Sequence, residues 1–435
     1  MNRFLLLLSA LALVAAACAA SRDEISEEFF PPVTSSSTTG DTTTTTTTTT
    51  LPPVETTPEQ AVEKLADTVR DIRQLAFDAP SVEYRSADDI ASGYDQLHGL
   101  PRTGDDRVDT AYLRMLGVLG DNASFEDLQS SCSLPGFYDP VTNTIALVEG
   151  LRELTPRGRS ILVHELVAAS TNQNYRWWDG MRSAQDGGDS EASVGVWGLV
   201  QGDAAFHAAQ YETEVLTATD RFAITLEQVN CERDRLQPRG YVLELESYGP
   251  EVGRAYVEEL LSVGGVEMLD EAYASLPQSS EQIYHPTRPA EDRPDLKSDL
   301  DSASITGFSV VDVGTLGERR FRAILSEGVG DAQALQAATG WGNDSYRMLW
   351  NGSDLVLVVT FEGDRAADAQ ELAETLGGWA SDSLSVGAGR PDNTGLAFEG
   401  EEYAFVSHRN GTMLMVLSND AAAGREVRDR FWPAW

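Results

Sequence analysis

Apolar residues recur at helical spacing where the chain leaves a long polar leader. Between Pro58 and Phe77 they return every three or four residues, which predicts an amphipathic helix that begins near Thr57. A short strand over Val82–Arg85 is expected next, followed by helices over Ala87–Leu97 and Arg107–Leu119. The first half of the folded region is therefore predicted to be mainly helical.

A pair of strands precedes the longest helical pattern. Alternating apolar residues over Thr144–Val148, next to a Tyr-Asp-Pro turn, predict two strands within residues 137–149. Thr155 and Pro156 then supply a cap and a first-turn proline for a helix. Acidic residues and glycines over 179–191 indicate a connecting loop, and a second helix is expected over residues 190–217.

The last third of the chain alternates between helices and strands. Helices are expected near residues 316–327 and 331–338, and another over 365–379. Asn-Gly pairs at Asn351 and Asn410 lie between alternating apolar runs, which is the strongest short signal for a β-hairpin. This order predicts an antiparallel sheet with helices on one face.

The first 57 residues are predicted to lie outside the folded part of the chain. Residues 1–17 carry a short apolar run after Arg3, which is typical of a secretory signal peptide. Cys18 follows three alanines, as in a bacterial lipobox, so we expect it to be lipidated. Cleavage without lipidation and an uncleaved anchor are the alternatives. Residues 18–57 are rich in threonine, serine and proline, which predicts a disordered linker.

The charge of the chain limits its partners. There are 69 acidic and 32 basic residues, and the net charge is −37. Binding of nucleic acid requires a basic surface, so that class of function is excluded. The acidic chain would also be repelled by anionic lipid headgroups. The lipid on Cys18 is therefore the expected contact with the cell membrane, on its extracytoplasmic side. In an exported protein the remaining cysteines, Cys132 and Cys231, are predicted to form a disulfide.

One segment comes close to a metal-binding motif. His164 and Glu165 begin an H-E-x-x-H pattern, but its last position is Ala168. In the complete pattern both histidines lie on one helix face and bind Zn²⁺, while the glutamate is the general base that activates the metal-bound water. Ala168 has no donor atom. His164 and Glu165 are therefore interpreted as a vestigial ligand and a vestigial general base.

Longer stretches resemble a family of gluzincin-like zinc metallopeptidases of bacterial cell envelopes. The family pattern H-E-L-T-H-A-L-Q-D-Q corresponds to HELVAASTNQ from His164, and its L-V-E-G-D-A helix corresponds to LVQGDA from Leu199. The resemblance implies that the third zinc ligand, a glutamate, is replaced by Gln201, whose neutral amide is a poor ligand for Zn²⁺. The resemblance also covers GFYDP and NTIALVEG, LPQSSEQIYHP, GTLGERRFRAIL and ATGWGNDSYRML.

Together these observations predict an α+β fold. A zincin-like, mainly helical peptidase domain with a short sheet is expected over residues 58–300, and a smaller antiparallel α/β sandwich over 301–435. The expected function is that of an envelope lipoprotein whose degenerate, inactive peptidase scaffold binds a peptide or an envelope protein, without a cofactor.

Two alternatives remain open at this point. The first is an active zinc peptidase in which other side chains replace the lost ligands, the candidates being Glu191, Asp203, His207 and His285. The second is a structural envelope lipoprotein with no binding site.

Overall fold

A computed structural model describes residues 58–98, 103–120, 123, 135–233, 240–288, 300, 304–384, 386–392 and 395–431. From Thr56 to Trp435 the chain forms one compact unit. The expected signal peptide, the linker, Cys18 and Cys132 lie outside the described residues. The lipid anchor and the bond between Cys132 and Cys231 therefore stay predictions.

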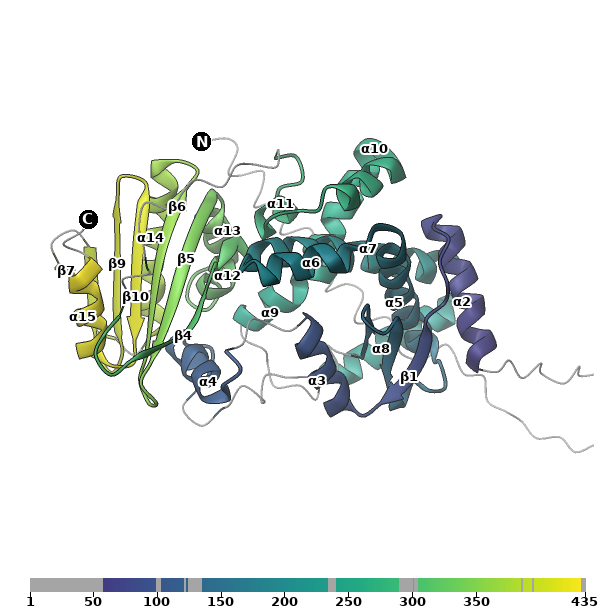
Figure 1. Cartoon of the computed structure of the whole chain (residues 1–435), viewed down its shortest axis with the longest axis horizontal. Coiled ribbons are helices and arrows are strands. Elements are labelled where there is room, and N and C mark those ends of the chain that lie inside the picture. Colours follow the sequence, from purple (N-terminus) through teal and green to yellow (C-terminus); the bar gives the residue numbers. More distant parts are fainter. Residues whose placement is uncertain are drawn as a thin grey trace, which may run out of the picture. The chain divides into compact units, whose positions relative to one another are not determined.

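Two long helices, α5 (Pro156–Tyr175) and α7 (Ser190–Glu214), form the centre of the helical part (Figure 1). They run in opposite directions, since Ser160 hydrogen-bonds Glu212 while His164 hydrogen-bonds Gln201. Besides these two polar pairs, apolar residues of both helices share one buried core. Other helices of this part are α2 (Pro58–Arg73), α3 (Ala87–His98), α4 (Asp106–Met115), η2 (Glu149–Leu151), α8 (Ala218–Arg233) and α11 (Ser280–Tyr284).

The start of α5 agrees with the sequence pattern, but the loop expected after α5 is wrong. Thr155 caps α5 by accepting a hydrogen bond from the Gly158 amide at 3.2 Å. Most of residues 179–191 belong to a helix, α6 (Trp177–Asp186), because Trp177 and Met181 are buried against the core. Only a short turn with Gly188 at φ 78° separates α6 from α7.

Helical structure continues through the Gly249-Pro250 pair. Helix α9 (Gly240–Ser247) runs through a π-helical segment, η3 (Tyr248–Gly253), into α10 (Arg254–Ala274). Here η3 packs directly on α7: a Cβ added at Gly202 would lie 2.2 Å from the carbonyl group of Gly253. Within α10 the backbone is broken at Gly265, where φ is 68°.

The helical part also contains a small sheet of three strands in the order β1-β3-β2. Strand β1 (Ser81–Arg85) is parallel to β3 (Thr144–Val148), which is antiparallel to β2 (Gly136–Asp139). Strand β2 is thus an edge strand, and it packs beside α5.

The C-terminal part is built on an antiparallel sheet of seven strands in the order β4-β5-β6-β10-β9-β8-β7. Both predicted Asn-Gly hairpins are confirmed, between β5 and β6 and between β9 and β10. The strands are β4 (Ser309–Gly314), β5 (Trp341–Trp350), β6 (Leu355–Gly363), β7 (Arg390–Asp392), β8 (Gly395–Glu399), β9 (Tyr403–Arg409) and β10 (Thr412–Ser418).

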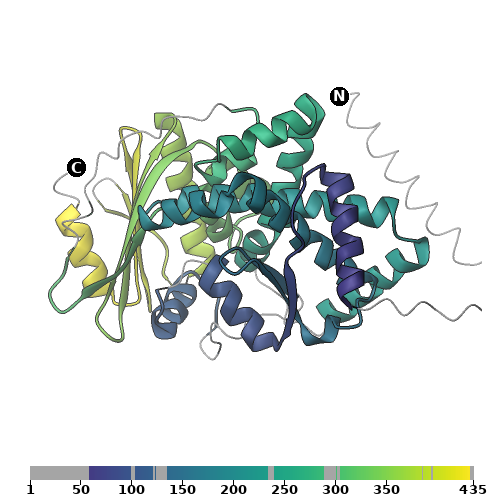
Figure 2. The ribbon, with the colours of Figure 1, turned by 45° about the vertical axis from the view of Figure 1, so that its right-hand side comes forward.

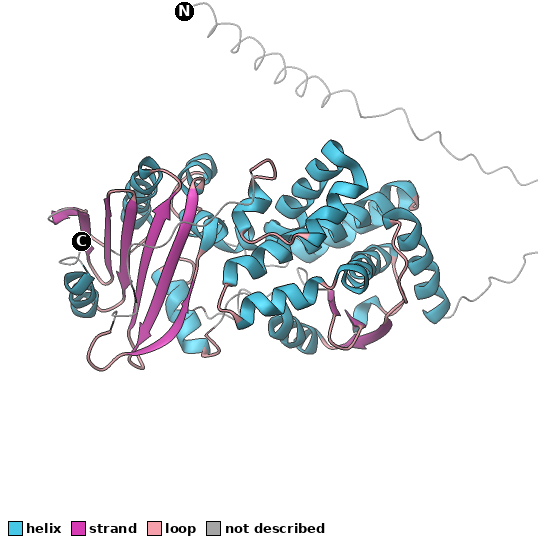
Figure 3. Cartoon of the chain, turned by 45° about the horizontal axis from the view of Figure 1, so that its top comes forward, coloured by secondary structure: helices cyan, strands magenta, loops and turns pink. Residues whose placement is uncertain are grey.

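Helices cover both faces of this sheet, which corrects the expectation of helices on one face (Figure 3). The first face packs against α12 (Gly317–Leu325), α13 (Asp331–Ala338) and α14 (Ala366–Ser383). The second packs against α15 (Ala421–Phe431) through Val427 and Phe431, because alternate residues of β6 and β10 are apolar on both sides.

The two halves of the described chain share part of one core. Tyr112 and Leu113 of α4, and Tyr241 and Leu245 of α9, lie in the same buried cluster as α14 and the sheet. The ribbon of α4 lies beside the large sheet in Figure 1 and Figure 2. The fold is therefore mixed α and β, and the division near residue 300 stays a prediction. Among the described helices, none combines the length and the apolar composition needed to cross a membrane.

Candidate functional site

The two positions that the resemblance assigns to zinc ligands on different helices face each other. Nε2 of His164 on α5 lies 3.1 Å from Oε1 of Gln201 on α7. Because a carbonyl oxygen can only accept, Nε2 carries the proton in this arrangement. Burial lowers the pKa of His164, although the contact with Gln201 opposes that shift. The imidazole is therefore neutral at physiological pH, and Nε2 is occupied by the amide.

Ala168 lies one helical turn after His164 on the same helix and is buried. Its carbonyl accepts a hydrogen bond from the Trp177 indole at 3.1 Å, but its side chain is a methyl group. In a complete H-E-x-x-H motif this position holds the second histidine. The helix is therefore present, but the residue at this position has no side-chain atom that could bind a metal.

Glu165 is directed at the edge strand of the small sheet. Its Oε2 accepts a hydrogen bond from the Tyr138 amide of β2 at 2.8 Å. Burial raises the pKa of Glu165 to about 8, even though the bond from Tyr138 favours the carboxylate. At neutral pH the side chain is mainly protonated, so it is a poor general base.

Asp203, two residues beyond Gln201, is the centre of a buried polar network. Its Oδ2 accepts hydrogen bonds from Nε of Arg73 and from the Tyr273 hydroxyl, both at 3.0 Å. Arg73 also binds Asp270 at 2.9 Å. Burial of Asp203 opposes ionisation, but Arg73 and His207 outweigh it and lower the pKa of Asp203. The network fixes α2 against α7 and α10.

Sequence reasoning missed the role of Arg73. The residue lies at helical spacing from Val62, Ala66 and Val69, so it occupies the apolar face of α2. A lone arginine on such a face signals a buried carboxylate partner, because an unpaired buried charge is very costly.

The other candidate ligands are each engaged elsewhere. Nδ1 of His207 lies 2.7 Å from Oδ1 of Asp203. Glu191, in the first turn of α7, accepts hydrogen bonds from the amide and hydroxyl of Ser280 at 2.9 and 2.7 Å. Its carboxylate also fills the space beside Gly317, where φ is 72°.

His285 joins the helical part to the C-terminal part. Nε2 of His285 lies 3.1 Å from both carboxylate oxygens of Glu318 on α12. Glu318 is fully buried and also binds Arg322 at 2.6 Å. Arg322 in turn lies over the ring of Tyr284 at 3.6 Å. The two segments EQIYHP and GERRFR therefore meet in one charged contact, which gives His285 a structural role.

These side chains do not fit a zinc ion. Within the described ranges, no group of three or more His, Cys, Asp or Glu residues is placed to hold a metal. His164 contributes one imidazole whose Nε2 binds Gln201, and Glu165 binds Tyr138. Zinc sites in proteins require three or four such donors around one point.

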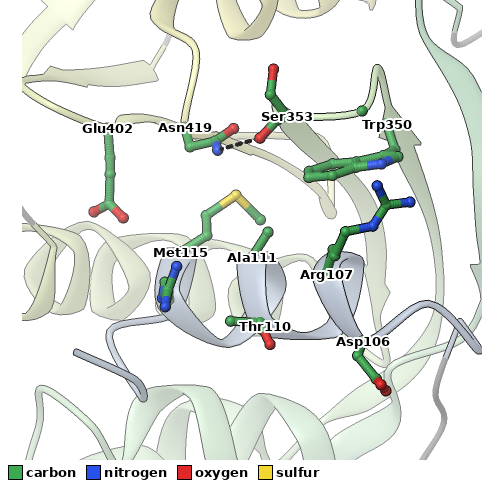
Figure 4. A pocket seen from close by; sticks show the side chains of 11 residues that line it. Asp106, Arg107, Thr110, Ala111, Met115, Trp350, Ser353, Glu402 and Asn419 are labelled. Atoms are coloured by element: carbon green, nitrogen blue, oxygen red, sulfur yellow. Dashed lines mark hydrogen bonds between the residues drawn. The ribbon is translucent and has the colours of Figure 1, made fainter. Parts of the chain in front are cut away.

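A pocket of about 530 Å³ lies away from these residues, between α4 and the sheet (Figure 4). Several of its polar groups already have partners: Arg107 binds Asp105, and Nδ2 of Asn419 binds the Ser353 carbonyl at 3.3 Å. No candidate residue of the motif lines it. The lining residues are Asp106, Arg107, Thr110, Ala111, Arg114, Met115, Trp350, Gly352, Ser353, Glu402 and Asn419.

Comparison with known proteins gives one match. Residues 308–428, which include all seven strands of the large sheet with α12 to α14, match the model of a family described as a domain of unknown function (DUF8575). Searches of curated proteins and of solved structures find no match to the chain. The chain is thus similar to this family over its C-terminal part.

Proposed function

We propose that this chain is a non-catalytic relative of the zinc metallopeptidases, a lipid-anchored envelope protein whose peptidase-like scaffold binds a peptide or an envelope protein. The contact between His164 and Gln201 carries this proposal. Two helices bring the former ligand positions together, but a neutral amide replaces the metal ion as the partner of the histidine. This facing pair supports a scaffold of the kind that the resemblance implies, in which two of the three ligand side chains are replaced.

The hydrogen bond between Glu165 and Tyr138 adds support. In the peptidases that this segment resembles, the glutamate activates water and the edge strand flanks the substrate cleft. Here the glutamate binds the edge strand itself, and its raised pKa keeps it protonated at neutral pH. An active enzyme with substituted ligands is less favoured, because Glu191, Asp203, His207 and His285 all have other partners.

Two measurements on the chain from Thr56 onward test the proposal. Elemental analysis after zinc loading and dialysis should find far less than one zinc per chain, and fluorescent casein should not be cleaved. One zinc per chain that is lost in His164→Ala would favour the active enzyme instead.

The binding function needs a separate experiment. A photo-crosslinking amino acid is placed at Val141, which is exposed in the turn between β2 and β3, and as a control at Val263 on α10. We expect a specific envelope protein to be captured from Val141 and not from Val263. Equal capture at both positions would favour the structural alternative.

A further inference from the structure

The pocket between α4 and the large sheet has one aromatic wall among polar side chains (Figure 4). Trp350 lies on one side of it and Glu402 on the other, with Met115 and Ala111 of α4 between them. Its volume of about 530 Å³ is within the range of small-molecule sites. Arg107, which also lines the pocket, is exposed, so the pocket opens to solvent.

The aromatic wall is held in a fixed position. Trp350 is the last residue of β5, pairs with Leu355 of β6 and packs against the core. In the turn that follows, Oδ1 of Asn351 accepts hydrogen bonds from the amides of Ser353 and Asp354 at 2.9 and 2.7 Å. The wall is therefore formed before any ligand arrives, which favours binding.

Two polar side chains of the lining are anchored and can still donate to a ligand. Asn419 accepts a hydrogen bond from the Leu355 amide at 2.7 Å, and its Nδ2 donates to the Ser353 carbonyl. That bond needs one of the two hydrogens on Nδ2. Arg107 donates through Nε and Nη2 to Asp105 at 3.0 and 2.7 Å, and its Nη1 is a further donor.

The charges that line the pocket cancel. Two arginines, Arg107 and Arg114, stand with two carboxylates, Asp106 and Glu402, although the whole chain has a net charge of −37. The field of distant charges is screened within about 8 Å at physiological salt, so the local balance decides. A ligand with a net charge would meet groups of its own sign in the pocket, and an uncharged ligand is favoured.

The ligand must nevertheless be polar. An apolar ligand would take Thr110, Ser353 and Asn419 out of water without replacing their hydrogen bonds, which is costly. A hydroxyl group both donates and accepts, so it suits arginine and amide donors as well as carboxylates. The face of the Trp350 indole carries the negative part of the ring quadrupole and attracts the weakly positive C–H groups of a sugar ring.

We infer that this pocket binds an uncharged sugar, with one face of the sugar ring on Trp350. Hydroxyls of the sugar bond to Asn419, Arg107 and Glu402. The volume admits a monosaccharide or a disaccharide, either free or as part of a longer envelope glycan. None of the zinc-motif residues lines the pocket, so this inference does not depend on the function proposed for the contact between His164 and Gln201.

Saturation-transfer NMR and calorimetry on the chain from Thr56 onward test the inference. The probes are glucose, galactose, mannose, N-acetylglucosamine, cellobiose and maltose. We expect at least one of them to bind with a Kd below about 10 mM. Trp350→Ala should weaken that binding at least about tenfold, and Trp350→Phe should weaken it less. Trp178→Ala, which changes a partly buried tryptophan on α6 outside the pocket, should leave it unchanged.

Two comparisons between ligands test the class and the source of the sugar. The anionic uronate and the cationic amino form of the sugar that binds should both bind more weakly than the uncharged sugar. Affinity that rises with the length of an oligosaccharide identifies an envelope glycan, and equal affinity for monomer and oligomer identifies a free sugar.

Three results would overturn the inference. These are no binding by any probe, preference for a charged form, and unchanged binding by Trp350→Ala with the circular dichroism of the parent. If Trp350→Ala does not fold, Thr110→Trp, which fills the pocket from α4, replaces it. Binding that survives in Thr110→Trp would place the sugar elsewhere.

Discussion

His164 and Gln201 are direct hydrogen-bond partners, with 3.1 Å between Nε2 and Oε1, although 37 residues separate them in the sequence. This distance is shorter than the separation of two atoms that bind one zinc ion at ~2.1 Å each from tetrahedral directions. The two side chains thus bind each other, and Glu165, the residue after His164, likewise binds a protein group, the amide of Tyr138.

Restoring the ligands should restore zinc binding. Ala168→His combined with Gln201→Glu supplies a histidine one turn after His164 and a carboxylate on the facing helix. We expect zinc affinity to rise on the order of 100-fold or more over the parent, measured by calorimetry. Peptidase activity should remain low, because residues that orient the ligands have also changed.

The matched control for this experiment is the same double variant with His164→Ala added. We expect this control to lose the increase in zinc affinity. A folded double variant with the parent's zinc affinity would show that α5 and α7 do not hold the three positions around one point.

The pH dependence of stability should report on Glu165. Its pKa is raised from 4.5 to about 8 in the folded protein, so the folded state keeps a proton that the unfolded chain loses. The free energy of unfolding therefore falls as pH rises through this window, by at most about 1.4 kcal/mol per pH unit from this group. Glu165→Gln should abolish that part of the slope.

Urea denaturation at several pH values between about 5 and 8 measures this slope. Glu258→Gln serves as the control, since Glu258 is an exposed carboxylate on α10. Identical slopes in the two variants would mean that Glu165 is ionised in the folded state.

Removing Arg73 should destabilise the helical part. Arg73→Met keeps most of the volume but leaves the buried Asp203 without its cationic partner. We expect a loss of about 3–5 kcal/mol, which corresponds to a melting temperature lower by roughly 6–20 °C in calorimetry. Arg254→Met removes an exposed ion pair and should cost less than about 1 kcal/mol. Equal effects of the two changes would argue against the buried network.

Two glycine substitutions should have opposite effects. Gly202→Ala forces a Cβ to within 2.2 Å of the Gly253 carbonyl and separates η3 from α7, which we expect to cost at least about 2 kcal/mol. Gly378 lies in α14 with nothing within 4 Å of an added Cβ. Gly378→Ala should therefore stabilise the protein by about 0.5–1 kcal/mol. Thermal denaturation of both variants checks the sign.

Local signals in the sequence predicted much of the secondary structure. Thr155 and Pro156 mark the start of α5, and the Asn-Gly pairs mark both hairpins of the large sheet. These local signals gave the wrong secondary structure where tertiary packing determines it. Asp and Gly residues suggested a loop at α6, but the burial of Trp177 and Met181 makes it a helix. The sequence also did not indicate that α15 covers the second face of the sheet.

The candidate site was predicted in part. The resemblance of HELVAASTNQ and LVQGDA assigned His164 and Gln201 to one site, and in the structure Nε2 of His164 lies 3.1 Å from Oε1 of Gln201. The partners of Arg73, Glu191 and His285 could not be predicted, because each bond joins segments far apart in the chain. Burial, which raises the pKa of Glu165, is likewise a property of the assembled fold.

The core shared by α4, α9 and the large sheet has a consequence for biosynthesis. The buried cluster that contains Tyr112 and Leu113 is complete only when β6 and β10 exist, and those strands are translated long after α4. At 5–20 residues per second this delay is on the order of 10–60 s. During that interval the apolar side of α4 has no native partner from the sheet. The nascent chain can therefore complete this core only after its C-terminal strands have been synthesised. A chain truncated before Thr412 would lack β10, and the apolar residues that pack on β10 would stay exposed.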